Sequence, residues 1–312
     1  MRTTSAHSTA STSRSSGGAP HRARASPALL LLAGAAWLGP APVTAQGPAA
    51  EEGDAAEHDS RSRSIGRTDQ GRLEHGVRLR ETPHVVRMSG GTTFGTEELV
   101  GLIHRAAARV HEESPGPRLL VGDLSRRGGG RLRPHSSHRN GRDADLGFYL
   151  TDEDGEPTEP ARFVELDHSA CGRDRGTAYC IDGERTFRLI AAMLDDPITR
   201  VQLILVAPDL REQILAAGRR LDVSDDVLGG VRTVTEARGG SEAHRSHLHV
   251  RIYCPVDDRP RCRDTPPFHA WYEGEPPTAR RARARRRRAI RRRRRAIRRR
   301  RARQRREQRR GR

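Results

Sequence analysis

The sequence predicts an α+β fold in which helices flank a small antiparallel sheet. Segments 143–150 and 247–254 alternate polar and apolar residues, which is the pattern of strands that bury one face. Segment 96–113 spaces its apolar residues as an amphipathic helix does and carries acidic residues in its first turn. We expect these elements to form one domain over residues 85–278.

The first half of this domain contains a tight turn between two strands. Residues 118–124 form an apolar run that predicts a strand, and residues 135–140 form a polar loop after it. The dipeptide Asn140-Gly141 is a strong signal for a tight turn. In the strand that follows, alternation places Asp143 and Asp145 on the polar face.

The second half contains two predicted helices and two predicted strands. Residues 201–206 are rich in β-branched and apolar side chains and predict a buried strand. Helical periodicity appears on either side of it, at 186–195 and 208–219. In segment 247–254 the polar face carries His247, His249, Arg251 and Tyr253.

The amino terminus has the features of a secretory signal peptide, assigned to residues 1–45. A basic, serine-rich stretch ends at Arg24, an apolar run covers residues 28–38, and small residues close the segment at Val43-Thr44-Ala45. The apolar run is shorter than the roughly 20 residues of a membrane-spanning helix. We therefore expect an exported, periplasmic protein that does not span the membrane; an uncleaved amino-terminal anchor is the alternative.

Two further segments are predicted to lie outside the folded domain. Residues 46–84 contain few large apolar side chains and predict a flexible linker. Residues 279–312 contain 22 arginines and one glutamate, a charge of +21, so the rest of a chain with net charge +18 carries −3. We expect a disordered tail that either binds anionic envelope polymers or lipids or is merely solvated; nucleic acid is a less favoured partner for an exported protein.

Four cysteines follow the signal segment, and an even count in an exported protein predicts disulfide bonds. Short loops favour the pairs Cys171–Cys180 and Cys254–Cys262, although three connectivities are possible. A four-cysteine zinc site is disfavoured because the chain has no Cys-x-x-Cys spacing.

Histidines and an aspartate on the two alternating segments predict a zinc site. Catalytic zinc takes three imidazole or carboxylate ligands and keeps one position open, and His138, Asp145, His247 and His249 supply such groups. The turn would fold His138 back beside Asp145, while strand alternation holds the other two imidazoles within about 7 Å of each other. Such an ion lowers the pKa of water to about 7 and polarises a carbonyl, which suits amide hydrolysis.

The alternative interpretation is that these histidines are surface or structural residues. For an isolated His-x-His pair that interpretation would be favoured. Here six of the 14 histidines fall in or near two short motifs, on strand faces where a packing role is least natural.

The two motifs together resemble the penicillin-insensitive murein endopeptidase family, which is related to the D-alanyl-D-alanine peptidases. The resemblance spans roughly residues 85–272. It includes Gly122-Asp123-Leu-Ser125 and glycines 128–130 before the first motif, and the segment from Cys254-Pro255 to Cys262 after the second. The motifs read His135-Ser-Ser-His138-Arg-Asn-Gly141-Arg-Asp-Ala-Asp145 and His244-Arg-Ser-His247-Leu-His249-Val-Arg-Ile-Tyr-Cys-Pro255.

The resemblance implies a zinc ion held by His138, Asp145 and His249, with His135 as a weaker ligand. It implies that His247 is the general base and that His244 orients or assists it. The implied substrate is the D-alanyl to meso-diaminopimelyl cross-link of peptidoglycan.

One position departs from related carboxypeptidases and dipeptidases. Those enzymes usually carry a glutamate three residues before the last zinc histidine, where this chain has Ser246. The departure favours an endopeptidase with a histidine base. A D-alanyl-D-alanine carboxypeptidase or dipeptidase on the same scaffold, and a non-catalytic cationic wall-binding protein, are the alternatives.

Other residues near the motifs each have two alternative roles or a supporting one. Asp143 is a candidate for orienting a ligand histidine. Arg251 could pair with a substrate carboxylate or be a plain surface residue. His135 with Asp167 and His168 could form a second metal site or belong to a solvated loop.

Overall fold

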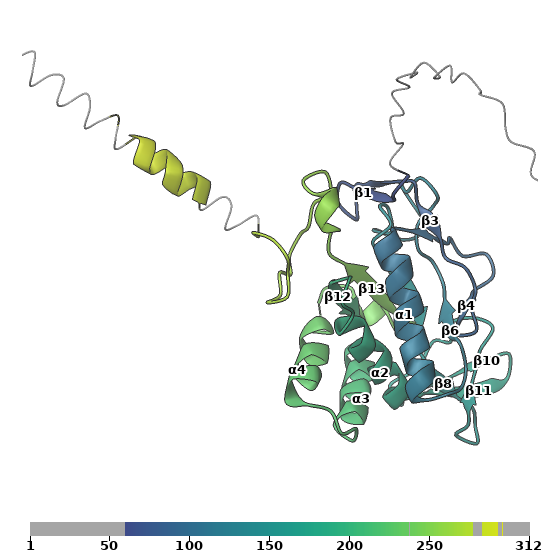
Figure 1. Ribbon diagram of the computed structural model, residues 1–312. Coiled ribbons are helices and arrows are strands. Elements are labelled where there is room, and N and C mark those ends of the chain that lie inside the picture. The colour runs from purple at the N-terminus through teal and green to yellow at the C-terminus, as the bar shows by residue number, and fades with distance from the viewer. Residues whose placement is uncertain (1–59, 237, 277–282, 293–294, 296–312) are drawn as a thin grey trace, which may run out of the picture. The chain divides into compact units, whose positions relative to one another are not determined.

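The computed structural model describes residues 60–236, 238–276, 283–292 and 295 of the chain (Figure 1). The predicted signal segment, 1–45, lies outside the described residues. So do residues 46–59 of the predicted linker and most of the predicted tail.

A five-stranded sheet with strand order β12-β13-β7-β6-β4 forms the centre of the fold. Neighbouring strands are antiparallel except for the pair β4–β6, which is parallel. The α+β prediction is therefore confirmed, with one parallel pair at the edge of the sheet. The strands are β4 (Val85–Arg87), β6 (Leu119–Val121), β7 (Asp143–Gly147), β12 (Val201–Leu205) and β13 (His247–Ile252).

The predicted strand alternation is present in β7 and β13. Leu248, Val250 and Ile252 are fully buried in the main hydrophobic core together with Ala144 and Leu146. Since successive side chains of a strand point to opposite faces, the polar residues of both strands share the other face. The predicted strand 143–150 is interrupted, because β7 ends at Gly147 and a separate strand begins at Leu150.

Four helices supply the other part of the core. They are α1 (Glu97–Glu113), α2 (Gly183–Leu194), α3 (Pro208–Gly218) and α4 (Asp225–Val234). The helix α2 contacts each of the other three, and their apolar faces join the same core as the sheet. The predicted helices 96–113, 186–195 and 208–219 correspond to α1, α2 and α3. Thr96 caps α1 by accepting a hydrogen bond from the Leu99 amide.

The helix α4 was not predicted from the sequence. Gly229 and Gly230 lie in its middle and lower its helix propensity. Ser224 caps its first turn, and Val231 and Val234 are buried, so tertiary packing stabilises a helix that the local sequence disfavours.

Short strands form three smaller sheets. The four-stranded one has the order β10-β11-β8-β9, and the pairs β1–β2 and β3–β5 form the others. Their bounds are β1 (Arg63–Ile65), β2 (Arg72–Glu74), β3 (Val77–Arg78), β5 (Phe94–Gly95), β8 (Leu150–Thr151), β9 (Pro157–Thr158), β10 (Cys171–Asp174) and β11 (Thr177–Ile181). Two short 3-10 helices, η1 (Ser241–Ala243) and η2 (Val256–Asp258), complete the elements.

The folded part begins earlier than the predicted boundary at residue 85. Strands β1, β2 and β3 lie within the segment 46–84 that composition predicts as a linker. Leu73 and Leu79 are buried, and the Ser64 amide donates a 2.7 Å hydrogen bond to Asp258 Oδ2. Segment 60–84 is therefore ordered by contacts with residues far along the chain, which local composition does not reveal.

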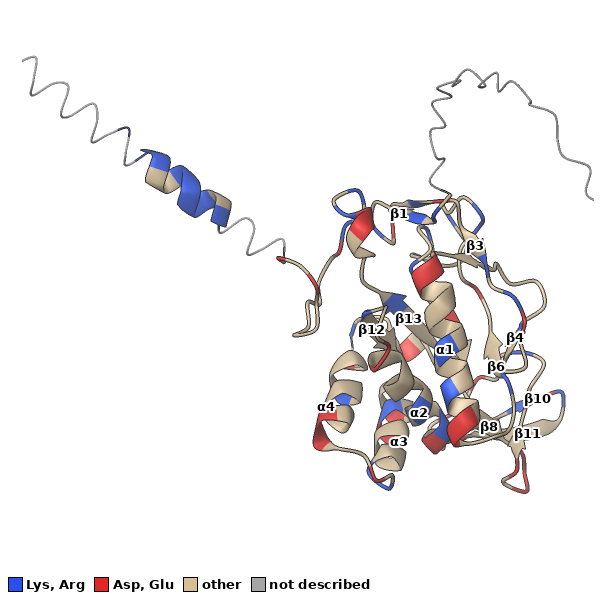
Figure 2. Cartoon of the chain, in the orientation of Figure 1, with Lys and Arg blue, Asp and Glu red and all other residues tan. Residues whose placement is uncertain are grey.

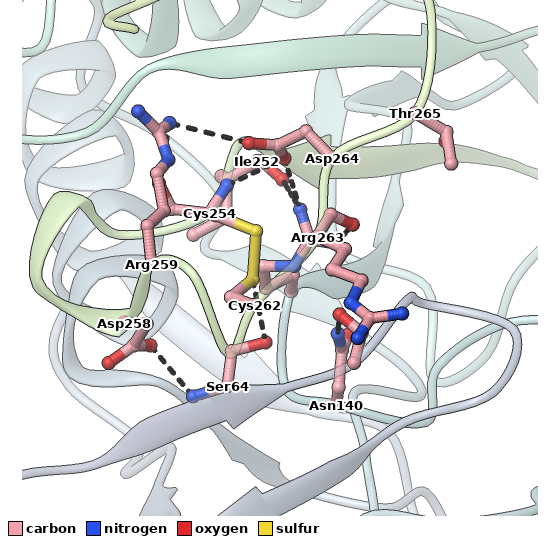
Figure 3. Close-up of a disulfide and its surroundings, with 12 residues drawn as sticks. Ser64, Asn140, Ile252, Cys254, Asp258, Arg259, Cys262, Arg263, Asp264 and Thr265 are labelled. Atoms are coloured by element: carbon pink, nitrogen blue, oxygen red, sulfur yellow. Dashed lines mark hydrogen bonds and ion pairs between the residues drawn. A yellow bond between two sulfur atoms is a disulfide. The ribbon is translucent and has the colours of Figure 1, made fainter. Parts of the chain in front are cut away.

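Both predicted disulfides are present. Cys171–Cys180 joins paired positions of β10 and β11, and Cys254–Cys262 closes the loop after β13. Figure 3 shows the second bond beside Ser64 of β1 and beside Asp264, whose carboxylate accepts a hydrogen bond from the Cys254 amide. This disulfide therefore lies where the amino-terminal strand meets the carboxy-terminal loop.

Part of the predicted disordered tail is described, and it is helical. Residues 283–292 form a helix whose side chains are all exposed, and Figure 2 shows it covered by arginine. Arginine and alanine both favour helix, which agrees with the weak helical periodicity of this segment. Among the described residues, no helix has the length and apolar character needed to cross a membrane.

Candidate metal centre

The register of β7 and β13 brings the two predicted motifs together. Asp145 lies directly opposite His249, and Asp143 lies opposite Arg251. Directly opposed residues of an antiparallel pair have Cβ atoms about 4.5–5.5 Å apart. Sheet pairing therefore places a carboxylate and an imidazole that are far apart in sequence within bonding reach.

His138 reaches the same point from the loop before β7. Its backbone has φ +62°, in the left-handed region that residues other than glycine rarely adopt. Ser125 Oγ holds it by donating to the His138 carbonyl at 2.8 Å and accepting from the Gly141 amide at 3.0 Å. Gly141 itself has φ +77°, as the predicted turn requires. The turn therefore folds His138 back beside Asp145, as predicted.

Three side-chain atoms meet at nearly equal distances. His138 Nε2 lies 3.1 Å from His249 Nδ1 and 3.2 Å from Asp145 Oδ1, and His249 Nδ1 lies 3.0 Å from that oxygen. All three residues are buried. His138, Asp145 and His249, which the motifs predict to be neighbours, thus form a compact triangle of polar atoms.

The hydrogen-bond partners of the imidazole nitrogens that face away from Asp145 determine which nitrogen of each ring carries the proton. His138 Nδ1 lies 2.7 Å from the Leu124 carbonyl, which can only accept, so Nδ1 carries the hydrogen. His249 Nε2 lies 3.1 Å from Asp143 Oδ1, a buried carboxylate, and donates to it. The neutral forms of both rings therefore direct lone pairs at Asp145 Oδ1, which is also an acceptor. Three acceptors this close need a cation among them.

The pKa values of His249 and Asp145 also indicate that a positive charge is stabilised between these side chains. Burial by itself would lower the pKa of His249, but hydrogen bonds to Asp143 and Asp145 outweigh it and raise the pKa to about 9. Burial also opposes the charge of Asp145, yet hydrogen bonds with His138 and His249 hold the pKa of that carboxyl well below its usual range. Either a proton or a metal ion can supply the positive charge. Three ligand atoms of this spacing fit one ion about 2.0–2.2 Å from each.

His135 lies on the other oxygen of Asp145. Its Nδ1 is 3.7 Å from Asp145 Oδ2, and the His135 and His138 ring centroids are 4.4 Å apart. Ligand atoms of His135, His138 and Asp145 all lie within 4.8 Å of one another, a group that could hold a metal ion. A hydrogen bond with Asp123 at 3.0 Å is the largest cause of a raised pKa for His135. His135 thus belongs to the centre.

His247 and His244 border the centre on its more open side. His247 Nε2 lies 3.5 Å from Asp145 Oδ1, and the His244 ring centroid lies 5.3 Å from that of His247. The side chain of His247 is 17% exposed, whereas that of His138 is 0% exposed. Burial lowers the pKa of His247 to about 4 and is also the largest cause of the lowered pKa of His244. Both rings are therefore neutral at neutral pH.

Backbone and side-chain contacts fix the segment that carries His244 and leads into His247 at the start of β13. Arg245 Nη1 and Nη2 donate to the two carboxylate oxygens of Asp209 at 2.9 and 2.6 Å, and its Nε donates to the Leu166 carbonyl. The Leu166 amide donates to the Arg245 carbonyl in return. His244 Nδ1 donates to the Gly240 carbonyl at 2.7 Å, which sets its tautomer.

The structure also gives the contacts of Asp143, Arg251, Asp167 and His168. Asp143 does orient a histidine, by accepting from His249 Nε2. Arg251 Nε donates to the same Asp143 oxygen at 2.6 Å. His168 is 88% exposed and pairs with Asp209, and Asp167 accepts from the Ser169 amide and hydroxyl. The structure therefore does not bring these last two residues to His135.

Sequence reasoning assigned no role to three residues that shape the centre. Asp123 holds His135, Ser125 holds the turn, and the Phe163 ring stacks on His247 with centroids 5.0 Å apart. Two of them belong to the segment Gly122-Asp123-Leu-Ser125, which is part of the resemblance but gave no role for either residue. Phe163 offers no local signal, because it reaches His247 only through the fold.

Known proteins resemble this chain over more than half of its length. A protein of Yersinia pestis named penicillin-insensitive murein endopeptidase is 28% identical over 207 residues, which cover 63% of this chain and 70% of that protein. An Escherichia coli protein of the same name is 32% identical over 186 residues, 58% of this chain and 61% of the relative. The sequence model of the family described as penicillin-insensitive murein endopeptidase matches residues 64–275. Because that match covers well over half of the 312 residues and includes every residue of the centre, the chain belongs to the penicillin-insensitive murein endopeptidase family.

Proposed function

We propose that this protein is a zinc-dependent endopeptidase that cleaves D-alanyl to meso-diaminopimelyl cross-links in peptidoglycan. The observation that carries the proposal is the meeting of three acceptor atoms from His138, Asp145 and His249 at 3.0–3.2 Å. Membership of a family of murein endopeptidases supports the substrate class.

In this proposal His138, Asp145 and His249 hold the ion, and His135 is an additional, weaker ligand. Imidazole nitrogen and carboxylate oxygen are ligands that zinc prefers. When bound, the ion polarises the amide carbonyl and makes water a better nucleophile. Asp143 and the Leu124 carbonyl fix the ligand rings by accepting from their outer nitrogens.

His247 is the proposed general base. Its lowered pKa keeps the ring neutral at neutral pH, so one nitrogen is free to accept a proton. Nδ1 lies 3.0 Å from Ser246 Oγ, and with the proton on Nδ1 the lone pair of Nε2 faces Asp145 and the centre. Ser246 itself offers only a hydroxyl, so His247 is left as the base, with His244 beside it to assist the return of the proton.

Digestion of purified sacculi tests the proposed activity. The full chain is expected to contain about one zinc per molecule and to convert cross-linked muropeptide dimers into monomers without releasing free D-alanine. A chelator should abolish cleavage and added zinc should restore it, because the ligand triangle supplies no nucleophile of its own. Chromatography of the digests with mass spectrometry measures both products.

Two results would contradict the proposal. Release of terminal D-alanine with dimers left intact would make the protein a carboxypeptidase. Retention on sacculi without zinc and without cleavage would make it a cationic wall-binding protein.

We further propose that segment 1–45 directs export to the periplasm and that the arginine tail holds the protein on anionic envelope surfaces. Exposed arginines over residues 283–292 support the second statement. Deletion of residues 279–312 is expected to lower retention on anionic vesicles or wall preparations, with the difference shrinking as salt rises. Cosedimentation measures retention, with neutral vesicles as the control. Equal retention of both forms at low salt would contradict the proposal.

A further inference from the structure

The loop before β7 concentrates arginines that have no acidic partner among the described residues. Five arginines lie between residues 126 and 139, in the same loop that carries His135 and His138. Within the described part of the chain, none of the five lies within 4.0 Å of a carboxylate. The arginines are Arg126, Arg127, Arg131, Arg133 and Arg139.

Arginines elsewhere in the folded domain commonly form ion pairs with carboxylates. Arg109, Arg118 and Arg200, for example, each contact a carboxylate at 3.0 Å or less. Asp123, which precedes the loop in sequence, is already engaged, since it accepts from the Thr92 amide and contacts His135. Carboxylates of the described residues therefore do not neutralise the positive charge of the loop that carries His135 and His138.

Backbone bonds, rather than ion pairs, hold this loop in shape. The Gly129 amide donates to the Arg126 carbonyl, and the Gly130 amide donates to the Arg139 carbonyl, both at 2.8 Å. Gly129 has φ +69°, and a Cβ there would lie 2.2 Å from the Arg139 carbonyl oxygen. These contacts fix the backbone of the loop, so one closed loop carries all five arginines together with His135 and His138.

The proposed substrate supplies an anion at the required place. In the cross-link, the amine of one diaminopimelate centre is acylated by D-alanine, and the carboxylate on that same carbon stays free. The substrate therefore carries a negative charge one carbon from the nitrogen of the scissile amide. A guanidinium group matches a carboxylate with its planar fork of donors.

We propose that the four exposed arginines, Arg126, Arg127, Arg131 and Arg133, form a rim that binds free carboxylates of the peptide substrate beside the scissile bond. We refer to these four residues as the arginine rim. The inference rests on the proposed function for the identity of the substrate. It adds a specificity: cross-links with a free diaminopimelate carboxylate are preferred over amidated ones.

The test compares two variants that remove equal charge. In the rim variant the four arginines become glutamine, and in the control R78Q/R80Q/R175Q/R232Q four other exposed arginines do. With a free-acid dimer, the rim variant is expected to raise KM about tenfold with little change in kcat, because exposed charge pairs contribute modestly and several are lost together. The control should stay within about twofold. With a dimer amidated at diaminopimelate, wild type and rim variant should have similar KM values.

Binding of fluorescent dimers to the His247→Ala protein, measured by anisotropy, separates this inference from the proposed activity. Tighter binding of the free-acid dimer, lost in the rim variant, supports the rim even if no protein form cleaves the dimer. Equal binding of free-acid and amidated dimers would overturn it, even if cleavage is observed. An equal rise of KM in the control would also overturn it.

Discussion

His249→Ala is expected to lose both zinc and activity, whereas His247→Ala keeps most of its zinc and loses turnover. His249 Nδ1 lies 3.1 and 3.0 Å from the two other proposed ligand atoms, and its ring is buried, so no water can easily replace it. His247 lies at the partly exposed border, where loss of a general base lowers kcat by about 10²–10⁴-fold. Zinc content after dialysis and kcat on cross-linked dimers measure the two effects.

His168→Ala is the matched control for these substitutions. His168 is a histidine of the same region, but its side chain is 88% exposed and pairs with Asp209 rather than with the centre. This variant should keep both zinc and turnover. Release of zinc by His168→Ala would instead support a second metal site that includes His168.

The opposite pattern would reverse the assignment. If His247→Ala lost the metal while His249→Ala retained it, His247 would be the ligand. In that case, hydrogen bonds with Asp143 and Asp145 alone would hold the His249 ring in place. The 3.5 Å distance from His247 Nε2 to Asp145 Oδ1 makes this a real alternative outcome.

Strand alternation explains why much of the centre could be predicted from the sequence. The period of two in segment 247–254 places His247 and His249 on one face, and the structure has Leu248, Val250 and Ile252 in the core as that period requires. The Asn140-Gly141 dipeptide predicted the turn that returns His138 to Asp145. Local patterns were sufficient for these two pairs, His247 with His249 and His138 with Asp145, because the members of each pair are close in sequence.

The features that could not be predicted depend on contacts between distant segments. The ordered strands β1 to β3 are held through partners such as Asp258, 194 residues from Ser64. Phe163 stacks on His247 although the two residues are far apart in the sequence. Composition alone, low in large apolar residues, predicted a linker at 46–84. No local pattern distinguishes a short strand with a distant partner from a flexible segment.

Arg142 is the residue for which sequence reasoning was least informative. It follows the predicted turn and looks like a surface residue, yet its side chain is 1% exposed. Nη1 donates to Asp264 Oδ1 at 2.9 Å and to the Ile252 carbonyl at 3.0 Å. Burial lowers the pKa of Arg142, and the charges of Asp264 and Asp143 oppose that effect. Asp264 is thus a buried counter-ion for it.

Asp264→Ala is therefore expected to lower the free energy of unfolding by about 3–5 kcal/mol, the usual cost of leaving one member of a buried ion pair alone. The same change removes the acceptor of the Cys254 amide, next to the disulfide in Figure 3. Urea unfolding of the zinc-free protein, with both disulfides intact, measures the loss as a lower midpoint at unchanged slope.

The control is Asp257→Ala, which removes an ion pair of similar length in an exposed place. Asp257 Oδ2 lies 2.6 Å from Arg61 Nη1, but the Asp257 side chain is 72% exposed. Water screens such a pair, so its loss should cost about 0–1 kcal/mol. If burial decides the energy, the two variants differ several-fold although their ion-pair distances are alike. Equal losses would mean that water reaches Arg142 in the folded protein, and that the Asp264 carboxylate is not needed to keep this charge beside Asp143 and the metal centre.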